Sequence, residues 1–183
     1  MLEVEMKFPA ADWKSLERGL AAWGAKELDA RREEDHYFNA PDRDFAHTDE
    51  ALRLRRVGSS NYLTYKGPKQ DPQTKTRTEI EIPFGPDHEA AEAMTQLLRH
   101  LGYRPVAVVE KQRRVLQLDR GGFVLEVCLD DVKNVGRFVE LEIQASGDQL
   151  ESARKVMLAA AADLGLNHSE RRSYLELLLA NRQ

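Results

Sequence analysis

The sequence predicts an α+β domain of about eight strands, mostly antiparallel, with three or four helices. The first observation is a strand-like alternation of charged and apolar residues, which recurs at 2–8, 35–38, 52–57, 61–66, 77–82, 106–118, 122–129 and 139–143. The second is a pair of turn sequences, at 58–61 and 119–122, that join successive strands as in β-hairpins. The third is a helical periodicity that follows three of the strands.

The helical segments share one arrangement: a strand containing Glu-x-Glu, then a helix, then a glycine that ends it. In the first, Trp13, Leu16 and Leu20 are spaced to form one apolar face, and Gly24 follows. A shorter apolar segment near the end of the chain predicts a fourth helix, and a loop is expected at 67–75. The predicted helices cover 12–23, 87–101, 148–164 and 173–180.

Length and composition indicate a single domain, 1–183, with enough chain for a sizeable core. The net charge of −4 argues against general affinity for nucleic acid, because proteins that bind the phosphate backbone usually carry a basic excess. Cys128 is the only cysteine, which suits a reducing compartment, and we expect it to be packed or pore-facing rather than a nucleophile. No apolar run approaches the length of a membrane span, and no signal peptide is indicated, so we expect a cytoplasmic protein that does not contact a membrane.

Charges of both signs gather on one face of nearly every predicted strand. In the first strand, Glu3, Glu5 and Lys7 fall on one side and the apolar residues fall on the other. A sheet closed into a barrel would place the charged face inside, with helices over the apolar outside. An open sheet would leave the charged face in solvent. The pattern alone does not decide between these two arrangements.

The alternating segments also form an ordered set of motifs. Glu3, Glu5 and Lys7 make a Glu-x-Glu-x-Lys motif, and further segments follow at 35–38, 51–55, 63–68, 77–81, 110–113, 129–132, 136–142 and 172–177. This set resembles the CYTH superfamily, also called the triphosphate tunnel metalloenzymes. The late segments Leu-Asp-Asp-Val, Phe-Val-Glu-Leu-Glu and Ser-Tyr-Leu-Glu-Leu are similar to its class IV adenylyl cyclase branch. The resemblance implies a closed eight-stranded antiparallel β-tunnel with a charged interior and helices packed outside.

The resemblance also implies a site for a triphosphate and a divalent metal, Mg²⁺ or Mn²⁺. Cationic side chains neutralise phosphate charge, and hard carboxylate oxygens suit these metals. The expected phosphate-binding residues are Lys7, Arg53, Arg55, Lys66, Arg77, Lys111 and Arg113. The expected metal ligands are Glu3, Glu5, Asp130, Glu140 and Glu142, and the expected catalytic residues are Lys7, Lys111 and Asp130. Glu126 is also expected to face inward, and Glu79 and Glu81 are expected to pair with tunnel arginines.

The resemblance favours an adenylyl cyclase that converts ATP to cyclic AMP and pyrophosphate. The alternative is a triphosphatase that acts on inorganic triphosphate or thiamine triphosphate with the same inward charges. A third interpretation, of another class, is a non-catalytic binder of polyphosphate or nucleotides. The expected partner is a nucleoside or other triphosphate substrate, with no nucleic acid and no membrane, and a homodimer is consistent with the cyclase branch.

Overall fold

The computed structural model describes residues 2–70 and 77–182, so 71–75 of the expected 67–75 loop lie outside the described residues. Eight antiparallel strands form one sheet in the order β1-β8-β7-β6-β2-β3-β4-β5. The strands are β1 Leu2–Pro9, β2 Lys26–Asn39, β3 Ala51–Val57, β4 Ser60–Lys66, β5 Glu79–Phe84, β6 Arg104–Arg120, β7 Phe123–Val132 and β8 Gly136–Ala145. The α+β class and the eight antiparallel strands are confirmed.

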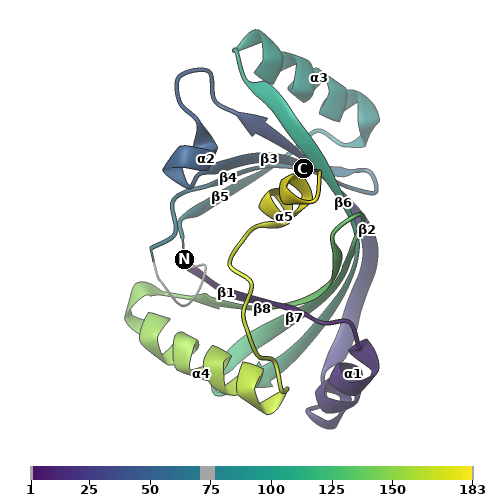
Figure 1. Ribbon diagram of the computed structural model, residues 1–183, viewed down its shortest axis with the longest axis vertical. Helices are drawn as coiled ribbons and strands as arrows, with labels where there is room; N and C mark the ends of the chain where they lie inside the picture. The colour runs from purple at the N-terminus through teal and green to yellow at the C-terminus, as the bar shows by residue number, and fades with distance from the viewer. Residues whose placement is uncertain (1, 71–76, 183) are drawn as a thin grey trace.

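The sheet curls strongly, so that its two halves face each other around a central space (Figure 1). Its edge strands are β1 and β5, and they do not pair along their lengths. Among the described residues, one isolated antiparallel bridge, between Glu3 and Arg77, joins β1 to the segment before β5. The structure is therefore a curled, open sheet, and the closed tunnel expected from the resemblance is not confirmed.

The predicted helices are all present. They are α1 Trp13–Ala22, α3 Asp87–His100, α4 Leu150–Asp163 and α5 Tyr174–Ala180. Asp12 caps α1 through a hydrogen bond from the backbone amide of Lys14, and Ser173 forms a capping box with Glu176 at the start of α5. Gly102 follows α3 with φ of 89°, where a side chain would lie against Pro41.

Two elements differ from the prediction. The short helix α2, Phe45–Thr48, was not predicted, because four residues are too few to show helical periodicity. Strand β2 begins at Lys26, although only 35–38 was predicted as a strand. Its first nine residues are mostly charged and exposed, so they lack the apolar alternation that identifies a half-buried strand.

Helices cover most of the apolar side chains on the convex face of the sheet, although Ile80 and Ile82 of β5 remain exposed. Val4, Leu125 and Leu141 pack with Leu20 of α1 and Met157 of α4, and all of these are essentially buried. On the other half of the sheet, α3 covers Leu54 and its neighbours. Because side chains alternate along a strand, this packing turns the charged residues of the same strands toward the concave face.

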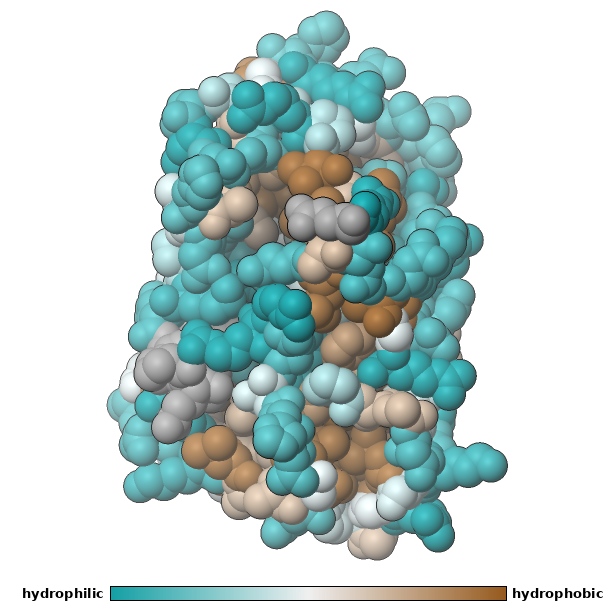
Figure 2. Space-filling model, viewed as in Figure 1, coloured by the Kyte–Doolittle hydropathy of each residue, from teal (hydrophilic) through white to brown (hydrophobic). Residues whose placement is uncertain are grey.

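Helix α5 lies inside the curl of the sheet rather than outside it (Figure 1). Tyr174 and Leu178 of this helix are buried against Val109, Val132 and Phe138. Figure 2 shows a mostly hydrophilic face on which apolar residues gather around the position of α5 and again lower down. The last helix thus forms one wall of the central space. None of the described helices is long and apolar enough to cross a membrane.

Candidate active site

The concave face of the sheet encloses a cavity of about 630 Å³. Its lining includes every predicted site residue except Asp130. These residues come from β1, β3, β4, β6, β8 and the segment before β5, and they are Glu3, Glu5, Lys7, Arg53, Arg55, Lys66, Arg77, Lys111, Arg113, Glu140 and Glu142. Residues far apart in the sequence are therefore brought to one chamber.

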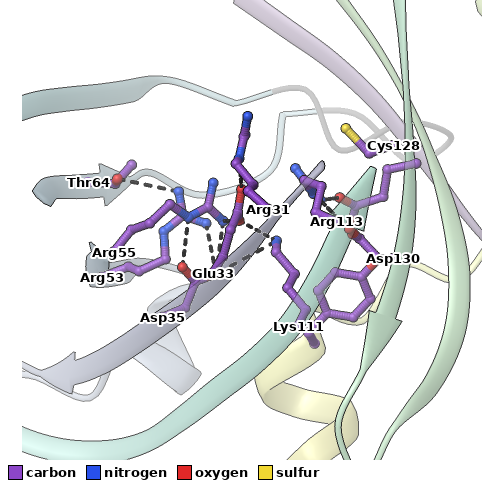
Figure 3. A network of polar contacts seen from close by, with 12 residues as sticks. Arg31, Glu33, Asp35, Arg53, Arg55, Thr64, Lys111, Arg113, Cys128 and Asp130 are labelled. Carbon is purple, nitrogen blue, oxygen red and sulfur yellow. Dashed lines mark hydrogen bonds and ion pairs between the residues drawn. The ribbon is translucent and has the colours of Figure 1, made fainter. Parts of the chain in front are cut away.

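The wall of one half of the cavity carries a cation network, formed by Arg53, Arg55 and Lys111 around the buried acids Glu33 and Asp35 (Figure 3). Arg55 makes a bidentate contact with Asp35, at 2.7 Å from Nε and 2.9 Å from an Nη atom. The same guanidinium lies 3.0 Å from Glu33, and Lys111 Nζ lies 3.1 Å from Glu33. Arg53 is 3.6 Å from Asp35 and also donates to Thr64. The acids fix the cations in place before any ligand arrives.

The two acids are ionised because the cations outweigh their burial. Burial raises the pKa of Asp35, but Arg55, Arg53 and Lys111 lower it further, and the net pKa is well below its usual range. Burial likewise raises the pKa of Glu33, and Lys111 with Arg55 brings it below its ordinary value. Both carboxylates are essentially inaccessible to solvent. The network therefore carries more fixed positive than negative charge toward the cavity.

Arg113 connects this network to a second buried group. It donates to both carboxylate oxygens of Asp130, at 2.7 and 2.6 Å, and also pairs with Glu140. Asp130 further accepts a 2.8 Å hydrogen bond from the Tyr174 hydroxyl. Burial, with the nearby Glu140 and Asp130, raises the pKa of Tyr174 well above its usual value, so the phenol remains a donor. Asp130 is fully buried behind Arg113, and its oxygens are already occupied.

The other half of the cavity carries a row of carboxylates. Glu5 on β1 lies opposite Glu142 on β8, which lies opposite Glu126 on β7. Ligand atoms of Glu126, Cys128 and Glu142 lie within 4.8 Å of one another. Like charges placed directly across a sheet are destabilising. We call Glu5, Glu142 and Glu126 the carboxylate row.

The charges of Glu142 and Glu3 are only partly compensated by nearby cations. Burial and then Glu3 raise the pKa of Glu142 well above its usual value, although Arg113 opposes this from 3.8 Å. Burial raises the pKa of Glu3, partly offset by Lys66 and reinforced by Glu79 and Glu5. A divalent cation would add positive charge here, and carboxylate oxygens are ligands that fit Mg²⁺ or Mn²⁺.

Residues near the open edge complete the lining. Lys66 Nζ lies 2.6 Å from Glu79 and 3.9 Å from Glu3. Glu79 and Glu81 also lie 3.9 and 3.7 Å from Arg53, so the predicted pairing of these acids with tunnel arginines is confirmed. The Nε atom of Arg77 is buried without a hydrogen-bond partner among the described residues. Lys7 is buried, donates to the Arg172 carbonyl at 2.5 Å, and has Nζ 4.0 Å from the centre of the Tyr174 ring.

Comparison with known proteins identifies the family. A CYTH domain model matches residues 1–174. The chain belongs to the CYTH family. Over 182 residues it is 36% identical to MJ0240 of Methanocaldococcus jannaschii, which carries a provisional adenylate cyclase name, with 97% of this chain and 98% of that protein covered. It is 30% identical over 181 residues to adenylate cyclase CyaB of Aeromonas hydrophila, covering 96% of this chain and 87% of that protein.

A solved structure resembles this CYTH chain closely. It is that of the PH1819 protein of Pyrococcus horikoshii OT3, with a TM-score of 0.86 and 36% identity. The match covers 98% of this chain and 99% of that chain. The family expected from the order of the motifs is thus confirmed.

Several residues in or directly behind the wall of this CYTH cavity were not assigned a role from the sequence. Glu33 and Asp35 alternate with Arg31 on β2, which is the same signal that identified Arg53 and Arg55. Tyr174 stands in the late Ser-Tyr-Leu-Glu-Leu motif, yet nothing in the sequence indicates that α5 folds into the sheet. Glu126 was expected to face inward, but its place beside Glu142 depends on strand register, which only the structure shows.

Proposed function

We propose that this CYTH protein is a metal-dependent enzyme that converts ATP to cyclic AMP and pyrophosphate. The observation that carries the proposal is the division of the cavity wall into a cation network and a facing set of poorly compensated carboxylates. A triphosphate with its divalent ion has the complementary distribution of charge. The named adenylate cyclase relative, 30% identical over nearly all of this chain, supports the choice of ATP and of cyclisation.

The phosphates would lie on Arg53, Arg55, Lys111 and Arg113. Guanidinium groups form bidentate contacts with phosphate oxygens, and an ammonium group acts as a compact point charge. Asp35, Glu33 and Asp130 hold these cations in fixed orientations, so little reorganisation accompanies the development of charge in the reaction. Asp130 is therefore proposed as a positioning residue for Arg113, in place of the metal-binding and catalytic roles expected from the sequence.

The metal would be held by Glu3 and by the carboxylate row. Glu140 lies beside them but pairs with Arg113, so it links the metal-binding half to the phosphate-binding half. A bound Mg²⁺ or Mn²⁺ would supply positive charge that stabilises the attacking and leaving oxygens. The raised pKa values of Glu3 and Glu142 support this assignment, because they indicate a site with excess negative charge.

In the proposed reaction the ribose 3′-oxygen bonds to the α-phosphorus, and the hydroxyl proton passes to solvent water. The bond between the α-phosphorus and the bridging oxygen breaks, and pyrophosphate leaves. Lys7 and Lys111 both place their ammonium groups over the Tyr174 ring, at 4.0 and 5.4 Å from its centre. In this proposal the two lysines stabilise negative charge on the transferring and leaving phosphates.

The test is an assay of the purified protein with ATP, inorganic triphosphate and thiamine triphosphate, in Mg²⁺ or Mn²⁺ and in a chelator. Products are identified by phosphorus NMR and chromatography. We expect metal-dependent formation of cyclic AMP and pyrophosphate from ATP. Formation of ADP and phosphate would contradict cyclisation and favour the triphosphatase alternative. Absence of turnover with every triphosphate would contradict the proposed enzyme as a whole.

A further inference from the structure

An arginine without an assigned role lies at one end of the cation network. Arg31 lines the cavity, and on β2 it precedes Glu33 and Asp35 at the period of two that places all three side chains on the concave face. Figure 3 shows its guanidinium beyond Glu33, on the side away from Lys111. Arg31 therefore extends the positive charge of the network by one position along β2.

Glu33 divides its carboxylate between Arg31 and the rest of the network. Its Oε1 atom accepts a 2.7 Å hydrogen bond from Nε of Arg31, whereas Oε2 lies 3.0 Å from Arg55 and 3.1 Å from Lys111. One buried negative charge is thus shared by three cations. Because Arg55 and Lys111 would still compensate Glu33 if Arg31 were replaced, the fold does not depend on Arg31 alone.

The second partner of Arg31 is an exposed acid. Nη1 donates to Asp29 at 2.8 Å, and Asp29 has a side chain that is 48% exposed and does not line the cavity. The Arg31 side chain is itself 31% exposed, compared with 7% for Arg53 and 6% for Arg113. An ion pair this open to water contributes little free energy, so an anion in the cavity can displace Asp29 from the guanidinium. Nη2 donates to none of the described residues.

Arg31 also lies directly opposite Arg113 in the ladder between β2 and β6. Like charges in this arrangement repel each other. Arg113 is already paired with Asp130 and Glu140, but among these groups nothing faces Arg31 from the cavity. A phosphate group near both guanidinium groups would relieve the repulsion, because its oxygens accept from several donors at once.

We propose that Arg31 binds the terminal phosphate of the triphosphate, and then the pyrophosphate that leaves, by exchanging Asp29 for a phosphate oxygen. This inference rests on the proposed function and deepens it, because it names a residue that holds the leaving group. The hydrogen bond from Nε to Glu33 is kept during the exchange, so the guanidinium stays oriented. The α-phosphate also carries the nucleoside, so the end of the substrate that consists of phosphate alone suits an end of the network formed by charged side chains. Asp29 is then a competitor of the phosphate.

The test measures the dissociation constants of inorganic pyrophosphate and of adenosine 5′-[α,β-methylene]triphosphate in Mn²⁺ by calorimetry. The variants are Arg31→Gln and Asp29→Asn. The matched controls are Arg32→Gln and Glu34→Gln, because these residues are also two positions apart, form a 2.9 Å ion pair and do not line the cavity. Circular dichroism checks that all four proteins fold.

We expect Arg31→Gln to weaken pyrophosphate binding about tenfold, because a charge-assisted contact is lost. We expect Asp29→Asn to tighten it about threefold, because the competing carboxylate no longer holds the guanidinium. The triphosphate analogue should change in the same directions. Both controls should stay within about twofold of wild type, since Glu34→Gln removes the same charge from the other face of the strand.

Unchanged pyrophosphate binding in Arg31→Gln would overturn the inference. A loss in Arg31→Gln without a gain in Asp29→Asn would show that Arg31 acts only by holding Glu33, and would overturn it too. Changes of the same size in the matched controls would have the same consequence. In each of these cases the wild type still binds both probes, so the proposed function stands. If the wild type binds neither probe, the proposed function fails together with the inference.

Discussion

The hydroxyl of Tyr174 donates a 2.8 Å hydrogen bond to Oδ2 of Asp130, so the C-terminal helix is tied to the buried base of the cation network. The ring of the same tyrosine lies beneath the ammonium group of Lys7 and packs edge-on against Phe138, with ring centres 5.2 Å apart. One side chain thus connects α5 to β1, β7 and β8. The position of α5 and the geometry of Arg113 are expected to depend on each other.

Tyr174→Phe removes the hydroxyl but keeps the ring under Lys7. A hydrogen bond to a charged acceptor contributes about 1.5–3 kcal/mol, so we expect the free energy of unfolding to fall by about 2 kcal/mol. We also expect kcat/KM for ATP to fall roughly tenfold. Asp130 would keep its hydrogen bonds from Arg113 but lose the one from Tyr174, so Arg113 would be held less precisely. Denaturant unfolding and steady-state kinetics check this. The control is Tyr103→Phe, because Tyr103 is partly buried against the apolar cluster that α3 covers. Equal stability of the two variants would contradict the role given to Tyr174.

Asp130→Asn separates a positioning role from metal binding. Removing one partner of a buried pair is strongly destabilising, and we expect a loss of about 3 kcal/mol together with a large fall in activity. The metal concentration that gives half-maximal activity should stay within about twofold of wild type, because Asp130 does not line the cavity. A metal titration of the residual activity makes the comparison. A strongly increased metal requirement would instead support the ligand role expected from the sequence.

Glu142→Gln is expected to have opposite effects on stability and activity. Without metal, the substitution removes a buried charge that repels its neighbours, so the melting temperature in a chelator should rise. Activity should fall at least ~10²-fold, or about 2.7 kcal/mol of transition-state stabilisation, because the metal is held less well. Melting curves in a chelator and turnover against Mn²⁺ concentration provide both readouts.

Glu140→Gln is the contrasting variant. Glu140 pairs with Arg113, so we expect a lower melting temperature as well as a ~10²-fold loss of activity. Glu151→Gln, on the exposed surface of α4, should change neither property. A lower melting temperature for Glu142→Gln, like that expected for Glu140→Gln, would contradict the claim that the charge of the carboxylate row destabilises the metal-free protein.

The metal-free protein is expected to have a stability maximum on the acid side of neutrality. The pKa values of Glu142 and Glu3 are raised above their ordinary 4.5. Between pH 4.5 and the raised pKa values of the folded state, the folded protein binds more protons than the unfolded protein. The free energy of unfolding therefore rises as the pH falls through this window. The pKa values of Asp35 and Glu33 are lowered from their ordinary 3.8 and 4.5. Below those ordinary values the unfolded state takes up the protons, and stability is lost as the pH falls toward the folded values.

Urea unfolding in a chelator at a series of pH values tests this profile. Glu142→Gln should flatten the rise on the neutral side, and saturating Mn²⁺ should remove it by holding the carboxylates ionised. Asp35→Asn should reduce the loss on the acid side. A wild-type stability that falls steadily from neutrality downward would contradict the pH dependence assigned to Glu142 and Glu3.

The alternation of residues predicted most of this fold because most strands have one face packed under helices, although Ile80 and Ile82 of β5 remain exposed. Period two alone placed Glu3, Glu5 and Lys7 on one face of their strand, and the family resemblance turned that face inward. The helices α1, α3 and α4 were predicted from their apolar spacing and final glycines. What the sequence did not reveal depends on contacts between distant segments. Whether β1 and β5 pair is decided by how far the sheet curls. The neighbours of Glu142 are set by register, and the burial of Asp130 is set by Arg113 and by a helix 44 residues later in the chain.

The central claim is that the carboxylate row binds a divalent metal next to cations that bind a triphosphate. The most direct test is a titration of the protein with Mn²⁺, followed by electron paramagnetic resonance of the free ion, with and without adenosine 5′-[α,β-methylene]triphosphate. We predict that wild type binds Mn²⁺, that the nucleotide tightens this binding, and that Glu142→Gln weakens it at least tenfold. Identical Mn²⁺ binding by wild type and Glu142→Gln, unaffected by the nucleotide, would contradict the account.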